Sequence, residues 1–300
     1  MKKHYAAAIS AFIIWGFFSI PLRALKEFSA GEILYFRILF SALVLLIIVL
    51  GFKRKDIKKD WTFFNGLSKS NKREVIGLTL AGGALLTVNW LTFIYIVNNI
   101  NIKTASFSYL ICPVITAVLG YVLIKERLSK LQWTAVALCA VSCILMGINS
   151  ALELGYSFLT AFTYALYLIS QRRNQGFDRM VMLGIQVLFS FLILNLFYGK
   201  LITSVPVAVE FYAITISIAI FFTVFPLFLN LFALNKINSA TIGILMYINP
   251  LLNFSIAFVV FNETISSIQI FGYLVIAIAL IMFNIPNFGK LRAAVSYQKS

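Results

Sequence analysis

Polar and aromatic residues recur at helical spacing inside the long apolar runs of this 300-residue chain. Ser106, Tyr109 and Pro113 stand at i, i+3 and i+7, which is one face of a helix. Gly243, Tyr247 and Pro250 stand at i, i+4 and i+7, which is again one face of a helix. Hydroxyl-bearing rings can stack on an organic molecule and hydrogen-bond to its polar groups. The alternative is that such side chains only join helices to each other or lie in interfacial belts.

The candidate substrate-binding residues are polar or aromatic and are costly to place inside a membrane. They are Trp15, Asn89, Trp90, Tyr95, Ser106, Tyr109, Tyr167, Asn230, Tyr247 and Asn249. Pro113 and Pro250 are the candidate hinges, because a proline inside a helix removes a backbone hydrogen bond and bends the helix. Kinks that serve packing alone are the alternative.

Three charged residues near the apolar runs are further candidates. Arg37 lies about one and a half turns inside its run, so we expect it to reach the outer interface or to pair with Glu32. Contact with a carboxylate-bearing substrate is the alternative. Glu126 and Glu263 are expected to cap the next helix or pair with a neighbouring base, rather than carry coupling protons. The only histidine, His4, is in the tail, so we predict no proton relay inside the membrane.

The composition requires a lipid environment for these residues. Hydrophobic residues make up 61% of the chain and charged residues 12%, and the mean hydropathy is +0.94. The apolar runs are 5–22, 32–50, 75–97, 105–124, 131–148, 154–170, 180–198, 209–234, 241–261 and 268–285. A helix of about 20 residues crosses a bilayer, and backbone in lipid must hydrogen-bond internally. The sequence therefore predicts an all-α, polytopic membrane protein with ten transmembrane helices.

The first run could also be a secretory signal peptide, since it follows Lys2 and Lys3. Against this interpretation, Trp15, Pro21 and Arg23 lie in the run or just after it, and no small-residue cleavage pattern ends it. We expect it to remain as a span.

The net charge of +15 arises from Lys and Arg between the apolar runs, so it does not indicate nucleic-acid binding. Most of these bases fall on the side of the two termini. The other side holds Arg23, Lys26, Lys103 and Lys200. The positive-inside rule thus predicts that both termini are cytoplasmic. In the one long loop, 51–74, the aromatic stretch 61–64 could anchor to an anionic leaflet, or the loop could simply be solvated.

An internal repeat relates the two halves of the chain. A shift of 137 residues aligns Pro113 with Pro250 and Glu126 with Glu263, together with several neighbouring polar residues. Five spans separate the copies, so the halves should insert with opposite orientation. Inverted repeats place a substrate site near the membrane midplane, between two bundles that can rock.

The repeat predicts three regions. Residues 1–149 form the first five-helix repeat, residues 150–286 form the second, and residues 287–300 form a basic cytoplasmic tail.

Four separated blocks resemble the RarD branch of the EamA permeases, in the drug/metabolite transporter superfamily. They are GEILYFRILFS (31–41), NWLTFIYIVNNINIKTASFSYLICPV (89–114), ERLSKLQW (126–133) and FPLFLNLFALNKINSATIGILMYINPLLNF (225–254). The resemblance implies two EamA domains in the bacterial inner membrane, with a central cavity lined by spans 1, 3, 4, 6, 8 and 9. Cys112-Pro113 departs from the pattern that Asn249-Pro250 keeps, which puts a polar role at position 112 in doubt.

These features together predict a secondary permease for an amino acid, metabolite or drug-like solute, working as an exporter by alternating access, without a cofactor. A receptor or structural protein of the same fold is the alternative. An enzyme is not expected, because the spans lack the His and carboxylate motifs of intramembrane catalysis.

The three cysteines, Cys112, Cys139 and Cys143, fall inside spans, which argues against a disulfide framework or a metal site. Two of them continue a stripe of small residues from Ala135 to Gly147. Such a stripe lets helices approach closely, so it could contact another span or a second subunit in a homodimer.

Overall fold

Helices make up all the regular structure of the described chain. Among the described residues, seven helical segments are long and apolar enough to cross a membrane, and two shorter apolar helices, Lys130–Leu145 and Ile270–Phe283, add to them. The prediction of an all-α polytopic membrane protein is confirmed. The computed structural model describes residues 2–100, 102–146, 151–202, 204–259 and 266–297.

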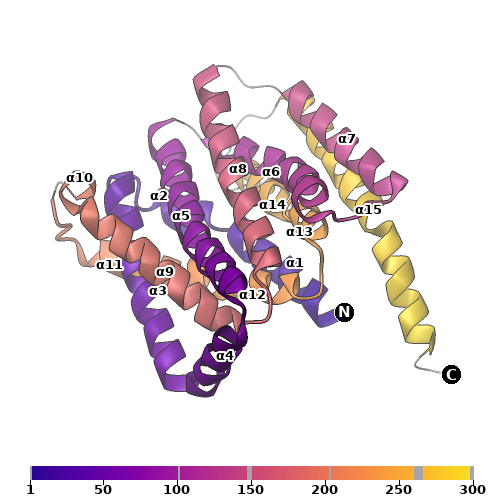
Figure 1. The fold of residues 1–300 in the computed structure, drawn as a ribbon. Coiled ribbons are helices and arrows are strands. Elements are labelled where there is room, and N and C mark those ends of the chain that lie inside the picture. The colour runs from indigo at the N-terminus through magenta and orange to yellow at the C-terminus, as the bar shows by residue number, and fades with distance from the viewer. Residues whose placement is uncertain (1, 101, 147–150, 203, 260–265, 298–300) are drawn as a thin grey trace.

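Figure 1 shows how the helices pack together. In chain order they are α1 (Lys2–Gly16), α2 (Ser19–Arg23), α3 (Ala30–Phe52), α4 (Arg54–Gly66), α5 (Lys69–Asn99), α6 (Ile102–Ile124), α7 (Lys130–Met146), α8 (Ala151–Arg173), α9 (Arg179–Leu196), α10 (Tyr198–Leu201), α11 (Val209–Ser217), the π-helix η1 (Ile218–Val224), α12 (Phe225–Leu234), α13 (Ser239–Leu245), α14 (Ile248–Val259) and α15 (Ser267–Tyr297). Each predicted apolar run coincides with one of these helices or with a consecutive group of them, and α4 lies in the long loop.

In the described part of the chain, three spans are interrupted. The first divides into α1 and α2, and the eighth passes from α11 through η1 into α12, whose first turn contains Pro226. Proline offers no N–H group, so the regular hydrogen-bond ladder is disturbed there. The ninth divides into α13 and α14, with Pro250 in the first turn of α14. Pro113 instead lies inside the continuous helix α6. Prolines that the repeat aligns therefore occupy different local structures.

Polar residues begin two of the long helices. Ser29 and Glu32 form a capping box at the start of α3, each side chain bonding the other residue's backbone N–H. Ser129 and Gln132 do the same before α7, at 2.9 and 3.3 Å. Both pairs satisfy backbone donors that a helix leaves free at its first turn.

One span of each half packs mainly against the other half, and we call these two spans the exchanged helices. Helix α1 of the first half packs against α12 and α14 of the second, and α8 of the second half packs against α5 and α6 of the first. Three further contacts pair equivalent spans: α3 with α9, α6 with α13, and α7 with α15, the last pair lying side by side in Figure 1. If each helix in these contacts is replaced by its counterpart in the other half, the same set of contacts results. This is expected for two related repeats with a pseudo-two-fold axis.

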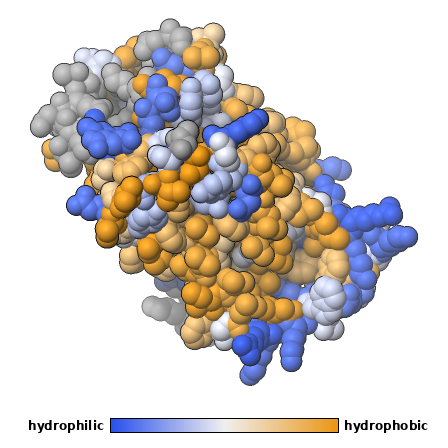
Figure 2. All heavy atoms as spheres, turned by 90° about the vertical axis from the view of Figure 1, so that its left-hand side faces the viewer, coloured by the Kyte–Doolittle hydropathy of each residue, from blue (hydrophilic) through white to orange (hydrophobic). Residues whose placement is uncertain are grey.

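Large apolar side chains cover the outside of the bundle. Ile47, Ile144 and Leu192 are 66%, 78% and 57% exposed. Figure 2 shows that the middle of one face is apolar and that hydrophilic side chains gather at its margins. An apolar surface of this extent is suited to lipid rather than to water.

The loop expected at 51–74 is largely helical, because it contains α4 and the first turn of α5. The Asp60 carboxylate accepts the backbone N–H of Asp178 at 3.0 Å, and the Phe63 ring packs on Phe177. Trp61 is 65% exposed, so an interfacial anchor here stays a prediction.

The small-residue stripe faces inward. Ala135, Cys139 and Cys143 are all buried, and the Cys143 thiol lies 3.4 Å from the carbonyl oxygen of Leu110. The stripe thus contacts other spans of the same chain, while Gly147 lies outside the described residues. His4 is also placed differently from the expected tail position: it is buried in α1 and stacks on Phe232.

Candidate solute-binding cavity

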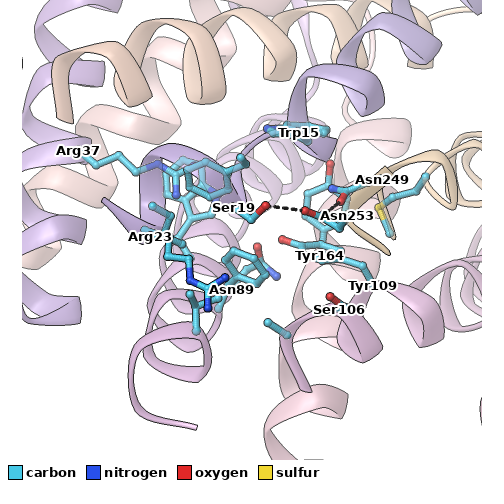
Figure 3. A pocket seen from close by; sticks show the side chains of 17 residues that line it. Trp15, Ser19, Arg23, Arg37, Asn89, Ser106, Tyr109, Tyr164, Asn249 and Asn253 are labelled. Carbon is cyan, nitrogen blue, oxygen red and sulfur yellow. Dashed lines mark hydrogen bonds between the residues drawn. The ribbon is translucent and has the colours of Figure 1, made fainter. Parts of the chain in front are cut away.

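A cavity lies between the two halves, where the exchanged helices α1 and α8 meet α5, α6 and α14 (Figure 3). Its volume is about 50 Å³, which is room for a few water molecules. Its described lining residues are Trp15, Phe18, Ser19, Leu22, Arg23, Arg37, Asn89, Trp90, Phe93, Val97, Ala105, Ser106, Tyr109, Tyr164, Met246, Asn249 and Asn253. None of these described residues is acidic. In this state the site is too narrow for an organic solute.

Six of the ten candidate binding residues line this cavity. They are Trp15, Asn89, Trp90, Ser106, Tyr109 and Asn249. The resemblance implied that spans 1, 3, 4, 6, 8 and 9 would line it. The described lining residues come from spans 1, 3, 4, 6 and 9, and span 2 contributes Arg37.

Span 8 lies behind the cavity and orients two side chains that line it. The Trp15 indole donates to the Phe222 carbonyl at 2.9 Å, and Arg37 Nε donates to Thr223 Oγ1 at 2.8 Å. Both acceptors belong to the π-helix η1. Thr223 in turn donates to the Ile218 carbonyl at 3.1 Å, so its remaining lone pair faces the guanidinium. The local disturbance before Pro226 thus positions two cavity residues.

Arg37 is held inside the bundle. It is 2% exposed, and its guanidinium carbon lies 4.9 Å from the ring centre of Phe18 and 4.8 Å from that of Trp90. Both distances are within the range of cation–π attraction. The expectation that Arg37 reaches the outer interface is wrong. Its side chain makes no ion pair with Glu32 or with any other residue that the structure describes.

Amide and hydroxyl groups face Arg37 from the other side of the cavity (Figure 3). Ser19 Oγ donates to Asn253 Oδ1 at 2.9 Å, and Asn253 Nδ2 donates to Asn249 Oδ1 at 2.6 Å. Ser19 belongs to the first half and both asparagines to the second. This chain of hydrogen bonds therefore joins the halves across the cavity.

Aromatic rings form much of the remaining wall. Tyr164 meets Trp15 and Tyr109 edge to face, with centroids 6.3 and 6.4 Å apart, and Phe93 lies 5.2 Å from Tyr109. Asn230, behind this wall, donates to the Tyr164 hydroxyl at 3.0 Å. That leaves the hydroxyl proton of Tyr164 available to another acceptor.

Asn89 connects the cavity wall of α5 to α8. It is fully buried, and its Nδ2 donates to the Thr160 carbonyl at 2.8 Å. Its Oδ1 is one of the buried polar atoms for which the described structure shows no hydrogen-bond partner.

Four of the candidate residues lie away from this cavity. Tyr95 is 39% exposed and packs on Tyr156. Tyr167 is fully buried beside Tyr164, and Asn230 supports that ring from behind. Tyr247 is fully buried in a second apolar cluster with Cys139 and Cys143.

Sequence reasoning missed several lining residues. The lining residues outside the candidate set include Phe18, Ser19, Phe93, Tyr164 and Asn253. Asn253 could have been found from its spacing, since it follows Asn249 at i+4 and shares its helix face. The two phenylalanines gave no such signal, because phenylalanine is abundant throughout the chain.

Glu126 joins the halves at the far end of α6. Its carboxylate accepts the backbone N–H groups of Ser239 and Ala240 at 2.9 and 3.1 Å, which are the first residues of α13. Arg172 Nε lies 3.7 Å from the same carboxylate, and Arg172 Nη1 donates to the Leu234 carbonyl. We call the contacts among these residues the Glu126 clamp.

Glu126 therefore caps a helix and lies beside a base, as expected, but its partners differ from those expected. It caps a helix of the other half rather than the next helix, which Ser129 caps. Its basic partner is Arg172 rather than one of the bases beside it in sequence. Glu263 lies outside the described residues.

Comparison with known proteins agrees with this architecture. The EamA-like transporter family matches residues 2–148 and 152–285. The chain is 30% identical to the uncharacterized transporter YojE of Bacillus subtilis, covering 99% of this chain and 98% of that protein. It is 26% identical to Protein RarD of Escherichia coli, with 92% of each covered.

A solved crystal structure shares the fold, with a TM-score of 0.69 at 12% identity, and covers 94% of this chain and 96% of that one. The two family matches, one on each half, explain the internal repeat and the pairwise packing of equivalent spans. The chain belongs to the EamA-like transporter family.

Proposed function

We propose that this transporter moves a small organic solute through the cavity between its halves by alternating access, in the direction of export. The observation that carries the proposal is the position of the cavity. Its lining runs from Tyr164, near the middle of α8, to Arg23 and Val97, near the ends of α2 and α5. The Glu126 clamp lies at the opposite end of the bundle, on the side of the chain termini.

Two sets of polar contacts between the halves support a two-state mechanism. The Glu126 clamp joins α6 to α13, and the Ser19–Asn253 hydrogen bond joins α2 to α14 nearer the other end. If the Glu126 clamp opens while the halves come closer together at the Ser19–Asn253 contact, the cavity becomes open to the other side of the membrane. A bound solute would thereby cross the membrane. The interruption between α13 and α14, beside Pro250, gives the second half a place to bend.

The positive-inside rule supports an orientation with both termini in the cytoplasm of a bacterial cell. In that orientation the Glu126 clamp closes the cytoplasmic end, and the structure corresponds to a state closed toward the cytoplasm. Among the described residues, the cavity lining offers no carboxylate or imidazole for a coupling proton. That favours exchange or facilitated diffusion.

The experiment is counterflow in proteoliposomes of the purified protein, screened with amino acids and other small metabolites, with and without an imposed pH gradient. The proposal expects saturable counterflow for at least one organic solute and a rate insensitive to the pH gradient. Empty vesicles and the variant Tyr109→Ala are the controls. Ligand binding without counterflow would support a receptor of the same fold instead.

A further inference from the structure

We propose that the solute is an organic anion whose carboxylate binds Arg37 and whose apolar body lies among the surrounding aromatic rings. The inference rests on the proposed function, because it names the substrate class of the same cavity. Its starting point is the Arg37 guanidinium, which is almost completely buried and lines the cavity.

The hydrogen bonds of this guanidinium are incomplete. Arg37 Nε donates to Thr223, while Arg37 Nη1 is buried without a hydrogen-bond partner in the described structure. A guanidinium in a protein keeps its charge and presents five donors, so two cation–π contacts leave most of its donor capacity unused. A buried charge without a counter-ion is strongly disfavoured in a membrane interior. An anionic ligand would supply both the charge and the acceptors.

The surroundings also favour an anion over other solutes. The described lining contains no Asp or Glu that could neutralise Arg37 or receive an ammonium group. A cationic solute would bring a second positive charge into the same small space, where Coulomb repulsion is poorly screened. A neutral solute would leave Arg37 without a counter-ion.

The geometry indicates which anion fits. The rings of Phe18 and Trp90 contact the guanidinium group, whose fixed fork of donors matches a carboxylate with two parallel hydrogen bonds. Elsewhere in the cavity wall, the rings of Phe93, Tyr109 and Tyr164 offer apolar and aromatic contact to the rest of the solute. A monocarboxylate with an aromatic or aliphatic body satisfies both parts once the cavity widens.

The test compares solutes that share one body and differ in charge. Binding is measured on the purified full-length protein by calorimetry and by quenching of tryptophan fluorescence, since two of the four tryptophans, Trp15 and Trp90, line the cavity. The probes are phenylacetate, indole-3-acetate and hexanoate, each beside its neutral amide and its amine. The wild type should bind at least one carboxylate about tenfold or more tightly than the matched amide, and the amines more weakly still. Potassium chloride at the same concentration should not displace the carboxylate.

The variants locate the effect. Arg37→Gln should lose the preference for the carboxylate, and Arg37→Lys should retain part of it, because Lys keeps the charge without the planar fork. Arg54→Gln removes an exposed arginine outside the cavity and should leave binding unchanged. If Arg37→Gln does not fold, the wild-type comparison of acid and amide and the Arg37→Lys variant decide the question.

Two outcomes would overturn the inference. One is amide binding as tight as carboxylate binding, or no carboxylate binding at all, in a protein that shows counterflow. The other is an unchanged carboxylate preference in a folded Arg37→Gln protein. Carboxylate binding through Arg37 without counterflow would instead contradict the proposed function and leave the inference standing.

Discussion

The carboxylate of Glu126, in the first half, accepts the backbone N–H of Ser239, the first residue of α13 in the second half, at 2.9 Å. A carboxylate at a helix N-terminus is stabilised by the free N–H groups and by the helix dipole. Because the bond crosses between the halves, it stabilises the arrangement in which this end of the bundle is closed.

Glu126→Gln should weaken this closed arrangement, because an amide has one acceptor oxygen in place of two and carries no charge. One of the two hydrogen bonds to α13, the charge assistance of the other and the attraction to Arg172 are lost. The expected cost is on the order of 1 to 2 kcal/mol. Cys112, which is fully buried beside Thr116 on α6, reports the opening through its rate of modification by a thiol reagent. Replacing Cys139 and Cys143 by alanine leaves Cys112 as the single cysteine of the chain.

The modification of Cys112 should be several-fold faster in Glu126→Gln than in the cysteine-reduced parent. Glu74→Gln is the matched control, since Glu74 also pairs with an arginine, Arg173, but both side chains are substantially exposed. Exposed pairs of this kind contribute little. Equal modification rates in the Glu126 and Glu74 variants would remove the clamp from the mechanism.

Tyr109→Ala and Tyr247→Ala should differ in effect, although each tyrosine lies about one helical turn before the aligned proline of its repeat. Tyr109 lines the cavity, so its loss should impair transport while the protein still folds. Tyr247 is fully buried in the cluster of α7 and α15, and its truncation should cost about 3 to 5 kcal/mol of stability. Thermal unfolding in detergent, measured beside counterflow, separates the two. Normal flux and stability in both variants would contradict both assignments.

Thr223→Val should reduce the affinity of the cavity for its solute, because Arg37 Nε would lose its acceptor while the shape of residue 223 is conserved. Thr223 is a positioning residue, so the effect should appear mainly in KM, with a smaller change in kcat. A loss of about tenfold corresponds to one hydrogen bond to a charged group. Thr223→Ser keeps the hydroxyl and should restore the wild-type value. An equal defect in the Ser and Val variants would indicate that the methyl packing of residue 223 matters instead.

Asp60 should make folding stability depend on pH at the α4 contact. Burial raises the pKa of this carboxyl above its ordinary 3.8, and the nearby charges of Asp178 and Asp56 raise it further, against the opposing backbone hydrogen bond from Asp178. The folded state therefore holds the proton more tightly than the unfolded state does. Stability is unaffected below the ordinary pKa and declines as the pH rises through the raised value.

Asp60→Asn should accordingly be at least as stable as the wild type at neutral pH, since the amide oxygen can still accept the Asp178 N–H. The difference should disappear near and below pH 3.8. Melting temperatures in detergent across this pH range measure it. A variant less stable than the wild type at neutral pH would show that the ionised Asp60 is stabilising.

The sequence alone determined that the chain is an all-α polytopic membrane protein, because hydrophobic length is a local property. Each apolar run coincides with one or more helices of the described structure, and the aligned Pro113 and Pro250 revealed the repeat. Spacing on single helices also identified part of the cavity, including Asn89 and Tyr109, since residues at i, i+3 and i+4 share a face whatever surrounds the helix.

Only the tertiary structure decided which of those faces meet. The repeat aligns Tyr109 with Met246, and packing between the halves brings both to the cavity, while Tyr247, one residue further along the chain, lies in the core. The direction of Arg37 depended on Thr223, which is 186 positions away in sequence and is turned inward by a π-helical stretch. Glu126 contacts Ser239 on α13 and Arg172 on α8, which are both distant in sequence. Contacts between distant segments depend on the geometry of the assembled bundle, and residue spacing along one helix carries no information about it.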